Sequence, residues 1–309
     1  MQVDFIKSEK EWENFLVVNN GSFLQSNIWY KFKKKYQDGC QLEVREKEKI
    51  TGLCQLFKEK TPFGSYFYIP HGPLTINKKI INILFEKITE KAKKENIIFI
   101  RTEPLYHIDV GIDSFSRVQP QKTLILDINR EDNEILQSFT TTTRRNIVIA
   151  KKKGVYIKEE DDVNLFFKLL LKTKNRQKFN SYNKEYFSFL LKNTPSHLSC
   201  AYYKESVIAA NIVLYYNKTA YCLHSATDYN YRNLKGANLL RYNSIINARD
   251  SGLLKFDNWG IDEIRFPGVT NFKKGFGGNE FTYPRGKDII LKKTTYNLYK
   301  FSFLLRKKI

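Results

Sequence analysis

The same order of expected elements occurs twice in this chain, and this duplication constrains the fold more than any other feature. The first half predicts strands within residues 41–58 around a turn at 46–49, a strand at 66–69, a helix at 79–94 and a strand at 97–100. The second half predicts strands at 200–203 and 207–216 around a turn at 204–206, a strand at 220–225, a helix at 236–251 and a strand at 253–257. A repeated unit of this kind predicts two similar α/β domains in tandem, each with a mixed sheet flanked by helices.

Length and core-forming content agree with two domains. The chain has 309 residues, more than one average domain, and its hydrophobic content of 42% is enough for two buried cores. We place the first domain at residues 1–143 and the second at residues 144–293. The segment 294–309 follows the second unit, and its aromatic and basic residues predict a helix that packs back on the first domain.

The strong positive charge indicates a polyanionic partner. The formal net charge is +20, which favours nucleic acid or an anionic membrane surface, although solubility alone also explains a lysine-rich chain. The densest cluster lies on an expected helix that a threonine begins and Gly154 ends, and it consists of Arg144, Arg145, Lys151, Lys152 and Lys153. These cations either form a solvated face or contact phosphates.

Other classes of site and location have no support in the sequence. The four cysteines form no C-x-x-C pair and the four histidines are far apart, so we expect reduced thiols and no metal site. The acidic N-terminal segment is not typical of a signal peptide, and no run of 18 apolar residues predicts a transmembrane helix. We therefore expect a cytoplasmic protein.

The stretch from Lys255 to Gly278 carries the residues best suited to chemistry. An expected strand ends at Asp257, a loop that contains Pro267 follows, and Phe272-Lys273-Lys274-Gly275-Phe276-Gly277-Gly278 closes the stretch. Glycines let a backbone approach a ligand closely, and lysines supply charge for a phosphate or a developing oxyanion. A glycine-rich β-turn with a solvated basic flank explains the same residues without any function.

A set of short motifs also runs in order through nearly the whole chain. The motifs are Phe23 to Ser26 with Trp29 and Lys33, Pro70 to Pro73, Arg144 to Val155, Thr173 with Arg176, Tyr186-Phe187, His224 to Ile261, and Phe272 to Gly278. In this order the set resembles the FemABX family of aminoacyltransferases. The stretch between Lys172 and Tyr186 is too short for the helical arm that some members insert, so the chain resembles the compact form.

The resemblance implies a fold, a reaction and a set of partners. The fold would be two tandem domains of the acyl-CoA N-acyltransferase (GNAT) type. The reaction would transfer an amino acid from aminoacyl-tRNA to an amino group of a peptidoglycan precursor stem peptide, as in interpeptide bridge formation. The acceptor would be UDP-MurNAc-pentapeptide or a lipid-linked precursor, and no cofactor is implied beyond the aminoacyl-tRNA co-substrate. We expect a monomer that contacts the inner face of the membrane peripherally.

The expected site residues follow from this resemblance and from the chemistry of the residues. Because an aminoacyl ester is already activated, the protein needs mainly to orient its substrates and stabilise the oxyanion. We expect Lys273 to stabilise the oxyanion, and Lys274 to point away from it along an extended segment. Asp257 would orient or deprotonate the amine, or serve only as a structural acceptor. The expected substrate-binding residues are Trp29, Lys33, Arg176, Tyr186, Tyr221, His224, Phe272, Phe276, Gly277 and Gly278, with Lys33 and Arg176 on the anionic part of the acceptor. The expected tRNA-binding residues are Arg144, Arg145, Lys151, Lys152, Lys153, Arg232 and Lys235.

Two other functions fit part of the sequence. An acyl-CoA-dependent GNAT enzyme needs a Q/R-x-x-G-x-G/A loop at a helix N-terminus. The nearest match is Arg232 to Ala237, in which Lys235 replaces the first glycine and its side chain obstructs the cradle, so CoA is disfavoured. A non-catalytic RNA-binding protein would use the basic helices and many tyrosines. It would give no reason for the segment 272–278, and no helix–turn–helix, zinc-finger or RRM signature is present.

Overall fold

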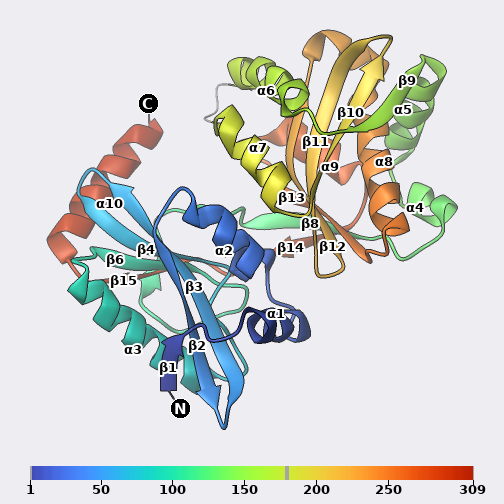
Figure 1. Cartoon of the computed structure of the whole chain (residues 1–309). Coiled ribbons are helices and arrows are strands. Elements are labelled where there is room, and N and C mark those ends of the chain that lie inside the picture. Colours follow the sequence, from blue (N-terminus) through green and yellow to red (C-terminus); the bar gives the residue numbers. More distant parts are fainter. Residues whose placement is uncertain (1, 178–180, 309) are drawn as a thin grey trace. The chain divides into compact units, whose positions relative to one another are not determined.

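The chain forms two compact units, each with one mixed sheet flanked by helices, as predicted (Figure 1). The computed structural model describes residues 2–177 and 181–308. The first unit contains residues 1–121 and 283–309, and the second contains residues 122–282. The second unit is therefore continuous in sequence, whereas the first is built from two separate segments.

The boundaries of these units differ from the expected ends at residues 143 and 293. Strand β8 (Lys122–Asp127) pairs with β13 (Lys255–Ile261) and β14 (Asn279–Thr282), so it belongs to the second unit. Strand β15 (Lys287–Ile290) pairs with β6 (Phe99–Glu103), so the chain is back in the first unit before residue 293. Both boundaries depend on pairing between strands that are far apart in sequence, which no local signal marks.

The sheet of the first unit has the strand order β1-β2-β3-β4-β6-β15-β7, with β5 paired to β3. Its other strands are β1 (Gln2–Phe5), β2 (Gly39–Glu46), β3 (Lys49–Thr61), β4 (Gly64–Pro70), β5 (Leu74–Thr75) and β7 (Ile112–Asp113). Its helices are α1 (Glu9–Val18), η1 (Phe23–Gln25), α2 (Asn27–Lys34), α3 (Lys78–Lys94) and α10 (Lys293–Lys308). The predicted start of α1 is confirmed, because the Ser8 hydroxyl accepts a hydrogen bond from the Glu11 N–H at 3.3 Å.

A buried ion pair joins the two segments of the first unit. The Arg101 guanidinium donates to both carboxylate oxygens of Asp288, at 2.8 and 2.7 Å, and both side chains are almost completely buried. Tyr296 of α10 donates its hydroxyl to the same carboxylate at 2.8 Å, and its ring lies edge-on to Phe99 at 5.2 Å. These contacts hold β15 and α10 against β6, so the C-terminal helix packs within the first unit.

The sheet of the second unit has the strand order β14-β8-β13-β12-β11-β10-β9. Its remaining strands are β9 (Val155–Glu160), β10 (Ser196–Tyr203), β11 (Ser206–Tyr216) and β12 (Thr219–Thr227), and its helices are α4 (Asp132–Ser138), α5 (Thr141–Lys152), α6 (Val163–Gln177), α7 (Lys184–Asn193), η2 (Tyr229–Leu234), α8 (Gly236–Asp250) and α9 (Pro267–Lys274). Figure 1 shows α6 and α7 on one side of the strands and α5 and α8 on the other. Neighbouring residues of β11 and β12 accordingly face different helices: Asn211 bonds to Ser244 of α8, whereas His224 contacts Phe187 of α7.

The two central parallel strands of the second sheet separate after a short pairing. Strands β12 and β13 pair only at Thr219–Tyr221 with Lys255–Asp257. Beyond that point β12 continues to Thr227 and β13 to Ile261 without a ladder between them. Diverging strands leave side chains and backbone accessible at the strand ends, where ligands bind in open α/β sheets.

Candidate active site

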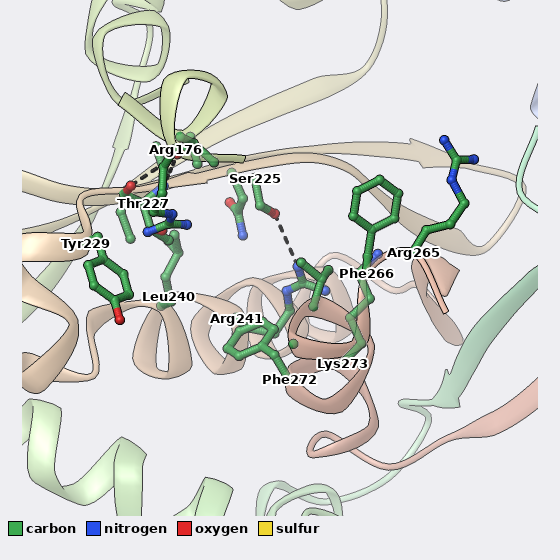
Figure 2. Close-up of a pocket in the computed structure, with 18 residues that line it drawn as sticks. Arg176, Ser225, Thr227, Tyr229, Leu240, Arg241, Arg265, Phe266, Phe272 and Lys273 are labelled. Atoms are coloured by element: carbon green, nitrogen blue, oxygen red, sulfur yellow. Dashed lines mark hydrogen bonds between the residues drawn. The ribbon is translucent and has the colours of Figure 1, made fainter. Parts of the chain in front are cut away.

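A cavity of about 630 Å³ lies against β11 and the end of β12, and its lining residue Lys273 bonds to the end of β13 (Figure 2). Its lining contains four cations, Arg176, Arg241, Arg265 and Lys273, and among the described residues that line it none is acidic. Alanine, leucine, valine and phenylalanine side chains form much of the remaining wall. The volume is within the range of small-molecule sites, and the charge favours an anionic ligand with an apolar part.

Lys273 reaches this cavity from a helix instead of an extended segment. Helix α9 begins with Pro267, whose missing N–H is not needed in a first turn, and ends at Lys274. The expected loop and extended segment are therefore wrong. Adjacent residues of a helix point about 100° apart, not in opposite directions. Lys274 turns to the surface, where it forms ion pairs with Glu263 and with Glu280.

The Lys273 ammonium is held at the end of strand β13. It donates a hydrogen bond to the Gly260 carbonyl at 2.6 Å and lies 3.4 Å from the Trp259 carbonyl. Burial, together with the nearby Arg241 guanidinium, lowers the pKa of Lys273 to about 8. The side chain is thus a fixed cation, partly buried in the cavity wall, that gives up its proton more readily than an ordinary lysine.

Asp257 is a supporting residue of the same strand. It lies inside β13, not at the end of a strand, and is 1% exposed. Its carboxylate accepts hydrogen bonds from the Thr123 hydroxyl and, at 2.7 Å, from the Trp259 N–H, and burial raises its pKa to about 6. The strand is irregular between Asp257 and Gly260, and Trp259 has a φ of 58°. The position favours the structural alternative, in which Asp257 holds the bulge that turns two carbonyls toward Lys273.

Arg241 is a cavity residue that the sequence did not single out. It lies on α8, is 3% exposed, and donates to the Asn258 side chain and to the Ser225 hydroxyl at 3.2 Å (Figure 2). Its guanidinium lies 5.8 Å from the centre of the Phe272 ring. The only sequence signal was an arginine directly after two core leucines of an expected helix. Arg265, Asn211 and Thr227 line the same cavity and were also missed.

Two of the expected anion-binding residues meet at one tyrosine. The guanidinium groups of Arg176 and Arg232 both contact the Tyr229 ring, at 4.7 and 4.4 Å from the ring centre. Arg176 and Tyr229 line the cavity. Lys235 follows with a φ of 59° and precedes the first residue of α8. Cations therefore gather beside the cavity where η2 leads into α8.

Several expected substrate-binding residues are not among the cavity-lining residues. Tyr186 stacks on Tyr182 at 3.8 Å, and His224, whose pKa burial lowers to about 4, packs edge-on to Phe187 at 5.0 Å. Both contacts belong to the α7 side of the sheet. Tyr221 lies edge-on to Trp259 at 6.0 Å, and burial raises its pKa.

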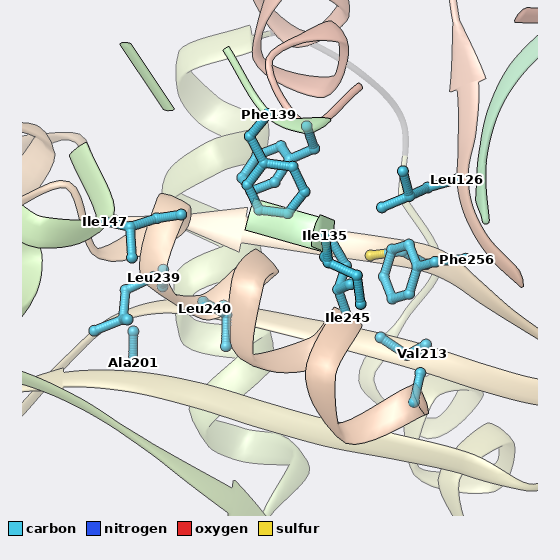
Figure 3. Packing of buried hydrophobic residues seen from close by; sticks show 14 of the residues in the cluster. Leu126, Ile135, Phe139, Ile147, Ala201, Val213, Leu239, Leu240, Ile245 and Phe256 are labelled. Carbon is cyan, nitrogen blue, oxygen red and sulfur yellow. The ribbon is translucent and has the colours of Figure 1, made fainter. Parts of the chain in front are cut away.

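The end of the glycine-rich segment is explained by packing. Phe276 is fully buried and contacts Phe139 at 5.1 Å, in the core that Figure 3 shows. Gly277 and Gly278 have φ values of 70° and 90°, and added Cβ atoms would lie 2.6 and 2.8 Å from backbone oxygens. These glycines form the turn into β14. They are not among the residues that line the cavity.

The basic helix begins and ends as predicted. The Thr140 hydroxyl caps α5 by accepting from the Thr143 N–H, and Gly154 follows the helix with a φ of 79°. Its cations differ in environment. Arg144 bonds back to the Phe139 carbonyl, Lys151 lies over the Tyr242 ring, Lys153 donates to the Asn233 carbonyl at 3.0 Å, and Arg145 and Lys152 are exposed. Their contact with tRNA stays a prediction.

Trp29 and Lys33 belong to the first unit. Both lie on α2, where the Trp29 ring contacts Phe23 at 5.1 Å and Phe32 at 5.0 Å. Burial lowers the pKa of Lys33, which is partly exposed. Lys33 and Arg176 were expected on one substrate but lie in different units.

Comparison of the fold identifies the class of protein. The crystal structure of FemX matches with a TM-score of 0.83 at 18% identity, over 97% of this chain and 100% of that chain. A tandem GNAT protein from the clavulanic acid biosynthesis pathway matches with a TM-score of 0.56 at 11% identity, over 93% of this chain and 97% of that chain. The chain therefore has a tandem GNAT-like fold, as predicted.

Comparison of the sequence then identifies the family. The model of the FemAB family matches residues 7–113, 106–201 and 196–302, and the chain belongs to this family. The lipid II:glycine glycyltransferase of Staphylococcus aureus strain MRSA252 is 28% identical over 207 residues, which cover 58% of this chain and 49% of that relative. The same enzyme from strain NCTC 8325 is 27% identical over 194 residues, with coverages of 54% and 46%. The chain thus spans about half the length of the curated relatives it matches. No helix in the described part of the chain is long and apolar enough to span a bilayer.

Proposed function

We propose that the protein transfers an amino acid from aminoacyl-tRNA to the amino group of a peptidoglycan precursor stem peptide. The observation that carries this proposal is the acid-free cationic cavity with a fixed lysine in its wall. Family membership and the name of the curated relatives, lipid II:glycine glycyltransferase, support the reaction class. The same relatives favour a lipid-linked acceptor over a soluble nucleotide-linked one.

The cavity residues suit an aminoacyl ester attached to RNA. The acceptor amine attacks the ester carbonyl carbon, the carbonyl oxygen becomes an oxyanion, and its collapse releases the ribose hydroxyl with the proton that the amine loses. A charged Lys273 beside this carbonyl would stabilise the oxyanion, which is worth about 10²–10³ in kcat for a single donor. Arg176 and Arg265, both exposed at the cavity, would contact phosphates, and Phe266 and Phe272 would pack on the apolar faces of the terminal nucleoside.

The arrangement needs little further chemistry from the protein. Orientation of an activated ester and an amine supplies about 7–11 kcal/mol of the barrier by itself. The substrate amine must be unprotonated, while Lys273 must be protonated. A pKa of about 8 for Lys273 leaves most of it charged at pH 7. We therefore expect activity to fall as the pH rises above about 8, where the lysine loses its charge.

The test is a direct transfer assay. Purified protein is incubated with a mixture of charged tRNAs and with either UDP-MurNAc-pentapeptide or lipid-linked precursor, and the products are identified by mass spectrometry. We expect a mass increase of one or more amino-acid residues on an acceptor, lost with uncharged tRNA and strongly reduced in Lys273→Ala. Absence of product with every charged tRNA, together with tight CoA binding by calorimetry, would instead assign an acyl-CoA-dependent reaction.

A further inference from the structure

The C-terminal helix α10 has apolar side chains on two opposite faces. One face is already packed: Tyr296 and Tyr299 contact Phe99 at 5.2 and 5.8 Å, and Phe303 contacts Phe115 at 5.4 Å. The bond from the Tyr296 hydroxyl to the buried Asp288 carboxylate fixes the rotation of the helix about its axis. This inner face is therefore buried by contacts within the first unit, and the opposite face of α10 takes no part in these contacts.

The outer face of α10 presents large apolar side chains to solvent. Leu298 is 52% exposed, Phe301 65%, Leu304 42% and Leu305 49%. At about 100° per residue these four side chains fall in one sector of roughly 120°, centred opposite the packed tyrosines. Thr294 and Asn297, near the start of the helix, are exposed polar residues of this sector, but from Leu298 to Arg306 every residue in the sector is apolar. The outer face is thus an unusual concentration of exposed apolar surface.

Cations and no acids accompany this outer face. From Ile289 to the end of α10 the sequence contains no Asp or Glu. Lys293 and Lys300 lie along one edge of the apolar sector, whereas Arg306 lies beyond its other edge, at a helix position next to that of Tyr299. Lys293 and Arg306 are exposed and Lys300 is partly exposed. Lysine and arginine at the borders of an apolar stripe can place their charges beside anionic head groups while the stripe enters the acyl boundary.

We propose that the outer face of α10 docks on a bilayer surface that contains anionic lipids. Four exposed apolar side chains supply the insertion, and the flanking cations supply electrostatic attraction, each worth about a fivefold gain in affinity near an anionic surface. The charge complementarity selects this occupant over an ordinary protein surface. The proposal goes beyond amino-acid transfer, and lipid vesicles without any peptidoglycan precursor test it separately from the enzymatic reaction.

The experiment is cosedimentation of the full chain with vesicles. We expect the protein to sediment with vesicles of phosphatidylglycerol and phosphatidylcholine, and at least tenfold less with phosphatidylcholine alone. Phe301→Ser combined with Leu305→Ser should weaken binding to the anionic vesicles by about tenfold or more. Lys293→Glu combined with Lys300→Glu should weaken it by a similar factor and reduce its dependence on salt.

Controls separate this surface from misfolding and from general stickiness. Val18→Ser removes another apolar side chain of the first unit, one that is 77% exposed, and should leave vesicle binding unchanged. All variants should keep the melting temperature of the parent. Unchanged sedimentation of the Phe301→Ser/Leu305→Ser variant would overturn the proposal. So would a parent dimer that this variant converts to a monomer without loss of vesicle binding, because the outer face would then join two copies of the chain.

Discussion

Replacing Lys273 with methionine separates a catalytic cation from a structural one. A fall in the pKa of Lys273 from 10.5 to about 8 means that the folded protein disfavours the charged form by about 3 kcal/mol at pH 7. Methionine keeps most of the volume and removes that penalty. It also removes the hydrogen bond to the Gly260 carbonyl, which costs about 1–2 kcal/mol. We therefore expect Lys273→Met to stabilise the protein by about 1–2 kcal/mol at pH 7 while lowering kcat by about 10²–10³.

The stability difference between the parent protein and Lys273→Met should depend on pH. Between pH 8 and pH 10.5 the unfolded lysine binds more protons than the folded one, so the stability of the parent protein rises with pH in this window. The destabilisation of the parent protein that comes from the lowered Lys273 pKa falls from about 3 kcal/mol at pH 7 to about 1.4 kcal/mol at pH 9.5. The gain in stability of Lys273→Met over the parent protein should therefore disappear by pH 9.5.

The assay is thermal unfolding of both proteins at pH 7 and pH 9.5, beside the transfer assay. For a unit of this size, 1 kcal/mol corresponds to about 2–4 °C in Tm. Lys274→Met is the matched control: it removes only ion pairs at the surface, so both Tm and activity should stay close to those of the parent protein. If Lys273→Met lowers Tm at pH 7 together with activity, the lysine is a structural cap and the catalytic assignment fails.

Four further variants test other parts of the molecule. Replacing Lys151, Lys152 and Lys153 with glutamate should weaken tRNA binding and lower the log–log salt slope of that binding by roughly one per lost phosphate contact. An unchanged slope would mean that these lysines form only a solvated face of α5. Asp288→Asn leaves the buried Arg101 charge without its partner and should cost about 3–5 kcal/mol in denaturant unfolding, so an unchanged midpoint would contradict that pairing. Lys33→Ala should raise the KM for the acceptor, whereas Arg176→Ala should weaken aminoacyl-tRNA binding; equal losses on both substrates would refute this division.

Local signals in the sequence predicted much of the fold. Caps such as Ser8 and Thr140 and the stop at Gly154 act within a few residues, so the ends of their helices were recoverable. The helix α9 was missed because Pro267 and the glycines after it are equally typical of a loop. Proline in a first turn and glycine after a last turn become helix signals only when tertiary packing supports the turns between them.

The candidate site was predicted only in part, because strands and helices far apart in sequence assemble it. Lys273 and Phe272 were found from their chemistry and from the family resemblance. Arg241 was missed because the sequence shows only one arginine in an expected helix and does not reveal its hydrogen bonds to Ser225 and Asn258. Gly277 was assigned to ligand approach, but the backbone of Ser138 is what leaves no room for a Cβ there.

The division of the first unit into two segments determines the order in which synthesis can complete each fold. All strands of the second unit, from β8 to β14, leave the ribosome before β15 and α10. Arg101 is therefore without Asp288 during the whole synthesis of residues 122–282. A buried guanidinium without its carboxylate is costly, so the first sheet cannot close until its last strand arrives. The unit whose synthesis begins first is thus the one whose folding finishes last.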